Sequence, residues 1–326
     1  MKQSAPEGLW AITSYFNPLG YQSRLKNYRV FRERLNVPLL TVEQQSPGCF
    51  ELSDKDADIL VQIPTEDILW QKERLLNLAV ESLPPECKFV VWLDCDIIFK
   101  REDWMVDAVV ELESHVMVQL FSRTLYLPKE VNLSDDLESQ AYLERRSTAS
   151  GILDGSVDAN PLGPGLEVLR KHGMGSQFSN GHAWIMRREP LQSVGFYEAM
   201  IVGGGDYVFL QAALGKFEVV RDSHGWTDPD SPQYKHFLSW AERFYAVVQG
   251  KIGNVPGDIY NLWHGELTNR GYLPRHKILT SQNFDPDSDI AIDEHGGLKW
   301  NSDKPELHRL VREYFQGRQE DGDLNV

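Results

Sequence analysis

The 326-residue chain carries 33 Lys and Arg against 48 Asp and Glu, a formal charge of −15, and 41% of its residues are hydrophobic. These values predict a folded, acidic protein with one large α/β domain or two smaller domains, and the charge disfavours general binding to nucleic acids or anionic membranes. Three widely spaced cysteines exclude a disulfide framework and a CxxC metal site.

The first 120 residues alternate between predicted strands and predicted helices. Short apolar runs predict buried strands over 9–14, 37–43, 88–93 and 116–121. Apolar side chains at helical spacing predict helices over 24–35, 67–83 and 103–113. This alternation is typical of a mostly parallel sheet with helices on both faces, so we expect a Rossmann-like, nucleotide-binding α/β half.

The rest of the chain is less regular. Residues 122–177 are polar and rich in turn formers, with a helix predicted over 135–146, and are interpreted as an insertion or mobile loop over the site. Apolar character returns at 182–186. Further helices are predicted over 207–214, 232–248 and 305–315, and the remainder beyond residue 272 is expected to be irregular.

Two carboxylates, Asp94 and Asp96, directly follow the strand at 88–93. Side chains at i and i+2 of an extended chain project to the same side, and ligands of open parallel sheets collect beyond the carboxyl ends of strands. This pair would suit Mg²⁺ or Mn²⁺ bound to a nucleotide diphosphate. The alternative is that both acids are ordinary turn or capping residues.

The segment 90–99, VVWLDCDIIF, resembles the DxD segment of metal-dependent glycosyltransferases with the GT-A fold. Within that fold the chain looks closest to the β-1,4-galactosyltransferase and polypeptide N-acetylgalactosaminyltransferase-like group. Residues 70–77, WQKERLLN, are similar to the group's helix that lines the nucleotide pocket. This similarity implies nucleotide contacts for Arg74 and Asn77.

A second signature of the group is followed by FSNGHAWIM at 178–186 and by GGGD at 203–206. It normally ends in Trp-Gly-Gly-Glu-Asp, whereas here Val202 replaces the aromatic residue and Gly205 the glutamate. Asp206 aligns with the acidic residue that acts as catalytic base in inverting members. Its own chemistry agrees, because glycines permit close backbone approach and a carboxylate can accept a proton from a hydroxyl; a helix N-cap is the alternative.

Related enzymes complete the metal sphere with a histidine well after the second acidic motif. His264, within IYNLWHG at 259–265, is the expected ligand, and His224 is its competitor. Neutral imidazole suits Mn²⁺ better than Mg²⁺. Arg270 and Arg275 could reach the diphosphate or serve on the surface.

The resemblance covers roughly residues 9–275. It implies a GT-A domain over 1–275, with 122–177 as its insertion, and a C-terminal extension over 276–326. The implied reaction is Mn²⁺-dependent transfer of a sugar, most simply from a UDP-sugar, to a hydroxyl acceptor such as a glycan or small molecule, with inversion. Two alternatives are a transferase acting on modified nucleic-acid bases, disfavoured by the charge, and a non-catalytic protein that binds nucleotide sugars or glycans.

Targeting signals are also absent from the sequence pattern. The N-terminus lacks an apolar stretch of signal-peptide length, and no segment reaches about 18 uninterrupted apolar residues. We therefore expect a cytoplasmic protein without a membrane span.

Overall fold

The structure is a computed structural model that describes residues 4–159, 177–228, 230–272 and 274–322. Its centre is a seven-stranded sheet in the order β11-β6-β10-β4-β1-β2-β3. The bounds are β1 Leu9–Phe16, β2 Leu39–Gln45, β3 Ile59–Pro64, β4 Phe89–Leu93, β6 Met117–Gln119, β10 Ala183–Arg187 and β11 Ile252–Asn254. Only β10 runs antiparallel to its neighbours in this sheet. The predicted α/β class with a mostly parallel sheet is confirmed.

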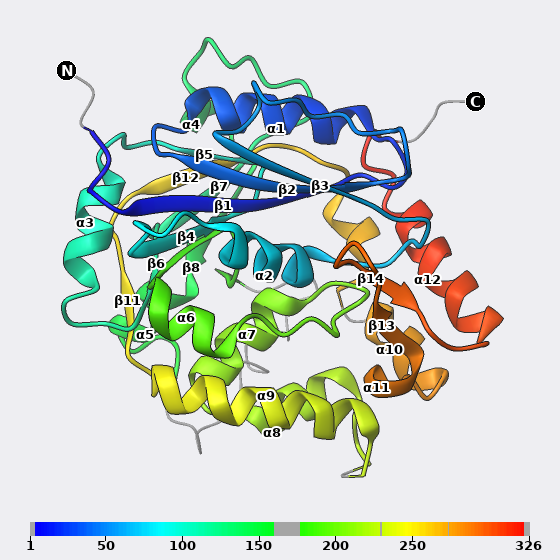
Figure 1. Ribbon diagram of the computed structural model, residues 1–326. Helices are drawn as coiled ribbons and strands as arrows, with labels where there is room; N and C mark the ends of the chain where they lie inside the picture. Colours follow the sequence, from blue (N-terminus) through cyan, green and yellow to red (C-terminus); the bar gives the residue numbers. More distant parts are fainter. Residues whose placement is uncertain (1–3, 160–176, 229, 273, 323–326) are drawn as a thin grey trace.

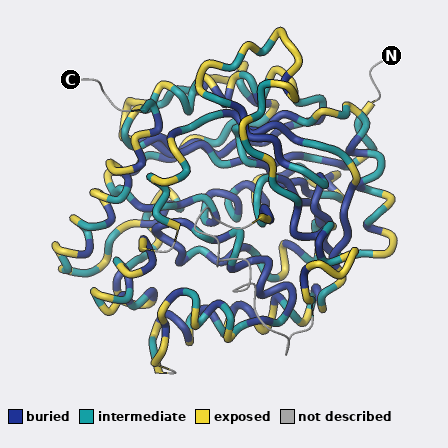
Figure 2. The backbone as a smooth tube through the Cα atoms, turned by 180° about the vertical axis from the view of Figure 1, so that it is seen from behind, coloured by how far each residue is buried: buried dark blue, intermediate teal, exposed yellow. Residues whose placement is uncertain are grey.

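Helices cover both faces of this sheet (Figure 1). Their bounds are α1 Gln22–Arg34, α2 Lys72–Ser82, α3 Trp104–Glu111, α6 Arg188–Val194, α7 Gly205–Ala213, α8 Phe217–His224 and α9 Pro232–Val248. Val91 and Leu93 of β4 pack with α1 and α3, whereas Val90 and Trp92 pack with α2, α6, α7 and α9. Because alternate side chains of β4 enter different cores, the strand needs the continuous apolar run seen in the sequence. Figure 2 shows buried residues along the strands and exposed residues on the outer turns of the helices.

A second sheet of five strands has the order β5-β12-β7-β8-β9. Its strands are β5 Ile97–Phe99, β7 Arg123–Tyr126, β8 Leu143–Ser147, β9 Phe178–Ser179 and β12 Asp258–Asn261. Segment 122–159 therefore contributes two strands, together with the short helices α4 Leu137–Gln140 and α5 Thr148–Leu153. The helix predicted over 135–146 is confirmed only for α4, because residues from Leu143 onward form β8, which pairs with β7. The expectation for residues 160–176 lies outside the described residues.

The C-terminal part is more regular than predicted. It contains β13 Ile290–Ile292 and β14 Leu298–Trp300, with η2 Leu267–Arg270, α10 Pro274–Ser281, α11 Pro286–Asp289 and α12 Pro305–Gly317. The Gln71 amide joins this part to the start of α2 by bonding both the N–H and the C=O of Leu298 at 2.7 and 2.8 Å. Beyond α12 the Asp321 carboxylate accepts hydrogen bonds from the N–H groups of Gln22 and Ser23 at the start of α1. The segment expected as an extension is thus packed against the first half of the chain.

All three cysteines are free. Within the described ranges, no helix combines the length and apolar character needed to cross a bilayer.

Candidate active site

A cavity of about 1010 Å³ lies beyond the carboxyl ends of β1 and β4. Ser14 and Phe16 at the end of β1 line it, and so do Asp94 and Asp96 after β4. The chain passes from β4 in the first sheet to β5 in the second sheet through these two acids, so both carboxylates lie where the sheets meet. This is the position at which open α/β sheets collect their ligands.

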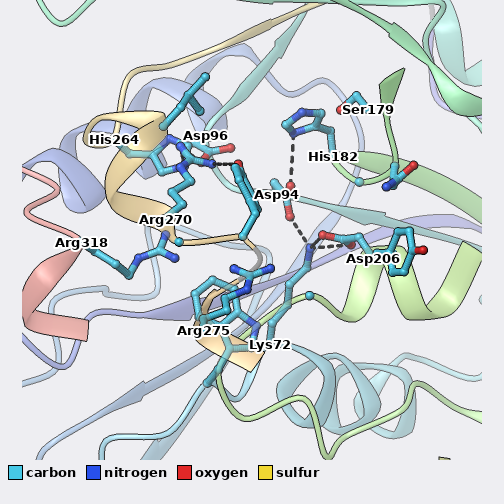
Figure 3. A pocket seen from close by; sticks show the side chains of 18 of the residues that line it. Lys72, Asp94, Asp96, Ser179, His182, Asp206, His264, Arg270, Arg275 and Arg318 are labelled. Atoms are coloured by element: carbon cyan, nitrogen blue, oxygen red, sulfur yellow. Dashed lines mark hydrogen bonds and ion pairs between the residues drawn. The ribbon is translucent and has the colours of Figure 1, made fainter. Parts of the chain in front are cut away.

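Asp94 is held by two cationic or polar neighbours. The Lys72 ammonium lies 2.6 Å from Asp94 Oδ1, and His182 Nδ1 lies 3.3 Å from Asp94 Oδ2 (Figure 3). Burial alone would raise the pKa of the Asp94 carboxyl, but the charge of Lys72 and the contact with His182 outweigh it and hold that pKa well below its usual range. Asp94 is therefore ionised throughout the physiological range, as a metal ligand must be.

His182 reaches the site from the turn before β10. Its backbone C=O accepts a hydrogen bond from the Asp94 N–H at 2.8 Å, which holds the residue at φ 75°, in the left-handed region that few non-glycine residues adopt. Its Nδ1 atom is buried, and its contact is the one with Asp94 Oδ2 at 3.3 Å. Ligand atoms of Asp94, Asp96 and His182 lie within 4.8 Å of one another. Two carboxylates and an imidazole nitrogen that faces one of them fit a divalent ion such as Mn²⁺.

His264, the histidine expected from the sequence, lies beside Asp96 but outside that group. Its Nδ1 is 3.1 Å from Asp96 Oδ2 and 2.9 Å from the Leu262 C=O, and its Nε2 faces the Arg270 guanidinium. Burial and the charge of Arg270 lower the pKa of His264 to about 4, so the ring is neutral. Both ring nitrogens are engaged. The competitor His224 also lines the cavity, with its ring centroid 4.1 Å from that of His276.

Asp206 enters the same cavity from the first turn of α7. Gly203 and Gly204, at φ 79° and 106°, turn the chain into this helix. The Lys72 ammonium lies 2.9 and 3.1 Å from the two Asp206 carboxylate oxygens and thereby joins Asp206 to Asp94. A Cβ atom on Gly181 would lie 2.7 Å from Asp206 Oδ2, so the glycine lets the acid approach the His182 turn.

Arg74 and Asn77 lie outside the cavity. The Arg74 guanidinium pairs with Glu198 at 2.9 Å and donates to the Gly296 C=O, and Asn77 donates to Glu198 at 2.6 Å. Neither lines the cavity, because α2 enters it only at its first residue, Lys72. Their placement gives no support to the nucleotide contacts that the resemblance implied.

Groups that line the cavity and that sequence reasoning missed include Lys72, His182 and Arg318. His182 had a signal, because it is a polar residue at the start of the apolar run 182–186. Lys72 had a weaker one, since it lies within 70–77, the segment similar to the helix that lines the nucleotide pocket in the resembled group. Arg318 had none, because its place depends on the folding of the whole C-terminal part.

Comparisons with known proteins give low similarity. No family model and no curated protein sequence matches the chain. Similar solved structures include glucosyl-3-phosphoglycerate synthase from Mycobacterium tuberculosis with Mn²⁺, UDP and phosphoglyceric acid, at 15% identity over 87% of this chain and 81% of that chain, with a TM-score of 0.38. TarS residues 1–349 from S. aureus with UDP-GlcNAc match at 10% identity over 97% of this chain and 74% of that chain, with a TM-score of 0.38.

The mannosyltransferase PcManGT from Pyrobaculum calidifontis, in complex with GDP-Man and Mn²⁺, is a third similar structure. It shares 15% identity over 75% of this chain and 68% of that chain, with a TM-score of 0.35.

Proposed function

We propose that this protein is a metal-dependent glycosyltransferase of the GT-A type, which moves a sugar from a nucleotide sugar, foremost a UDP-sugar, to a hydroxyl acceptor. The proposal rests on one observation. Ligand atoms of Asp94, Asp96 and His182 lie within 4.8 Å of one another, in the cavity that Asp206 also lines. The first three residues suit a cation that binds a diphosphate, and the fourth suits a base for an acceptor hydroxyl.

Asp94, Asp96 and His182 would hold Mn²⁺, or Mg²⁺ in its place. When bound, a divalent ion supplies positive charge to the diphosphate leaving group. His264 would then orient Asp96 through their 3.1 Å contact, in the way that second partners orient metal ligands. Direct ligation by His264, as the sequence indicated, is the alternative to His182.

Asp206 is the proposed base. Its carboxylate takes the proton of the acceptor hydroxyl while the acceptor oxygen bonds to the anomeric carbon. The bond from that carbon to the diphosphate oxygen breaks on the opposite face, so one displacement inverts the configuration. Lys72 holds the Asp206 carboxylate in place through two hydrogen bonds.

The C-terminal part belongs to the proposed catalytic unit. Arg270, against His264, is placed to meet the negative charge of the diphosphate, and Arg318 and Glu320 line the same cavity. Glu320 pairs with both Arg318 and Arg24, which ties residues after α12 to α1. Removal of residues 276–326 is therefore expected to damage the site as well as the fold.

Incubation with a panel of nucleotide sugars and Mn²⁺ tests the proposal through release of the nucleoside diphosphate. We expect release that EDTA suppresses and that the Asp94→Asn/Asp96→Asn variant lacks, whereas the surface variant Asp303→Asn behaves as the unmodified protein. Thermal stabilisation by nucleotide sugars without any release would identify a binding protein instead of an enzyme. Neither stabilisation nor release would exclude both functions.

A further inference from the structure

Arg275 is a buried cation on α10 that lines the cavity next to the proposed base. Its exposed fraction is 9%. A Cβ atom on Gly203 would lie 3.2 Å from Arg275 Nη1, and one on Gly204 would lie 3.2 Å from Nη2. These glycines directly precede the turn of α7 that carries Asp206. The guanidinium therefore lies on the Asp206 side of the cavity, whereas Arg270 lies on the Asp96 side, against His264.

Within residues 4–159, 177–228, 230–272 and 274–322, no carboxylate pairs with Arg275. Its contacts are the Tyr314 hydroxyl, which accepts from Nη1 at 3.1 Å, and the Tyr272 ring, whose centroid is 5.3 Å from Cζ. Its Nε atom is buried and has no hydrogen-bond partner in these ranges. A buried cation without a counter-charge is unfavourable, and the usual compensation is an anion that accepts its hydrogen bonds.

A neighbouring phenol indicates that the positive charge of Arg275 is not neutralised. Burial would raise the pKa of the Tyr314 phenol, yet that pKa is lowered, chiefly by the charge of Arg275. Arg275 thus retains a field that attracts anions.

The cavity also has room for a second substrate. Pockets for one drug-sized ligand span about 300–1,000 Å³, and this cavity of about 1010 Å³ is at the upper end of that range. A donor at the Asp94 and Asp96 end would leave space along Gly204 and Arg275. An acceptor there would have its hydroxyl near Asp206 and another group near the guanidinium.

On the basis of the proposed function, we propose that the acceptor is an anionic hydroxyl compound whose phosphate or carboxylate group pairs with Arg275 while its hydroxyl faces Asp206. A guanidinium fork matches the two oxygens of either anion, which would fix the orientation of the acceptor as well as bind it. Arg275 is then a residue that determines acceptor specificity, and Arg270 serves the donor.

Calorimetric titration of the full-length protein, saturated with UDP and Mn²⁺, tests this inference with three probes: glycerol 3-phosphate, glycerate and glycerol. We expect at least one of the two anions to bind at least about tenfold more tightly than glycerol, the size of a charge-assisted hydrogen bond. Saturation with UDP blocks the diphosphate position, so the anion has to bind elsewhere. Equal affinity for glycerol and both anions would overturn the inference.

Variants of Arg275 test whether its guanidinium binds the anion. We expect Arg275→Gln to weaken anion binding at least about tenfold and Arg275→Lys to retain part of it, with UDP·Mn²⁺ affinity unchanged in both. Arg309→Gln, on the exposed face of α12, should change neither affinity. If Arg275→Gln lowers the affinity for UDP·Mn²⁺ or leaves anion binding intact, Arg275 does not serve the acceptor. Failure of the unmodified protein to bind UDP·Mn²⁺ would instead refute the proposed function.

Discussion

The carboxyl group of Glu73 fills the space that a side chain at Gly205 would need. A Cβ atom on Gly205 would lie 1.9 Å from Glu73 Oε1, far inside contact distance. Glu73 is only 5% exposed and directly follows Lys72, which contacts Asp206. The burial of Glu73 therefore requires a residue without a side chain at position 205.

Gly205→Ala should destabilise the protein by about 1–3 kcal/mol, because the new methyl group overlaps Glu73 in a packed interior. Urea unfolding measures this change. Gly317→Ala is the matched control, since a Cβ atom there would meet nothing within 4 Å. In the Glu73→Ala background the effect of Gly205→Ala should shrink, because the overlapping carboxyl is gone. Equal losses in both backgrounds would contradict the packing argument.

Glu73 should make stability depend on pH. Burial, opposed by the charge of Lys72, raises the pKa of Glu73 from 4.5 to about 8. The stabilisation that this neutral carboxyl contributes is thus complete below about pH 4.5 and is lost as the pH rises toward 8, by up to about 1.4 kcal/mol per pH unit. Above pH 8 both states are ionised and the loss stops. Glu73→Gln should flatten the unfolding free energy between pH 5 and 8, whereas Glu81→Gln, exposed on the same helix, should leave the slope intact.

The sequence predicted those parts of the fold that depend on local pattern. The apolar run at 88–93 and the acids that follow it identified β4 and its carboxyl end, and Asp206 was expected at the start of a helix that the structure places in the same cavity. The helix at 135–146 fails beyond α4 because pairing of β8 with β7 overrides the helical propensity of that segment. Such local patterns do not predict long-range packing, which is what brings Arg318 into the cavity.

His182 and His264 show a second limit of prediction from sequence, the choice between two nearby histidines. Both are near the acids in space, but the sequence favoured His264 because of its position after the acidic motifs. What distinguishes them is the direction of their ring nitrogens. Nδ1 of His182 faces Asp94 and lies within 4.8 Å of ligand atoms of both acids, whereas the nitrogens of His264 face Leu262, Asp96 and Arg270. Such directions follow from backbone geometry, here a positive φ at His182, which no spacing of residues encodes.

Lys72→Met should make the protein depend on metal. The ammonium now neutralises Asp94 and Asp206 without any ion, so its loss from this largely buried pair should destabilise the metal-free protein by about 3 kcal/mol. Mn²⁺ should restore more stability in this variant than in the unmodified protein, because the ion no longer competes with Lys72 for Asp94. Thermal unfolding with and without Mn²⁺ measures both effects, with the more exposed Lys100→Met as control. The same Mn²⁺ shift in both proteins would show that Lys72 and the ion do not share Asp94.

His182→Asn should weaken Mn²⁺ binding at least about tenfold, since it removes a nitrogen ligand while asparagine tolerates the left-handed backbone at this position. His264→Asn should have a smaller effect, because His264 acts through Asp96. His224→Asn should leave the affinity unchanged. Isothermal titration with Mn²⁺ ranks the three variants. If the loss falls on His264→Asn instead, the ligand set indicated by the sequence holds and His182 has another role.

Asp206→Asn should separate binding from turnover. Asparagine keeps the shape of the side chain but cannot take a proton, so release of nucleoside diphosphate with acceptor should fall by about 10²–10⁴-fold. Affinity for UDP and Mn²⁺ should stay within about threefold of the unmodified protein, since Asp206 is outside the group of Asp94, Asp96 and His182. Lys72 retains its 2.6 Å contact with Asp94 in the variant, which preserves the start of α2. A fully active Asp206→Asn enzyme would require another base, and a variant that no longer binds UDP would place Asp206 in the donor site.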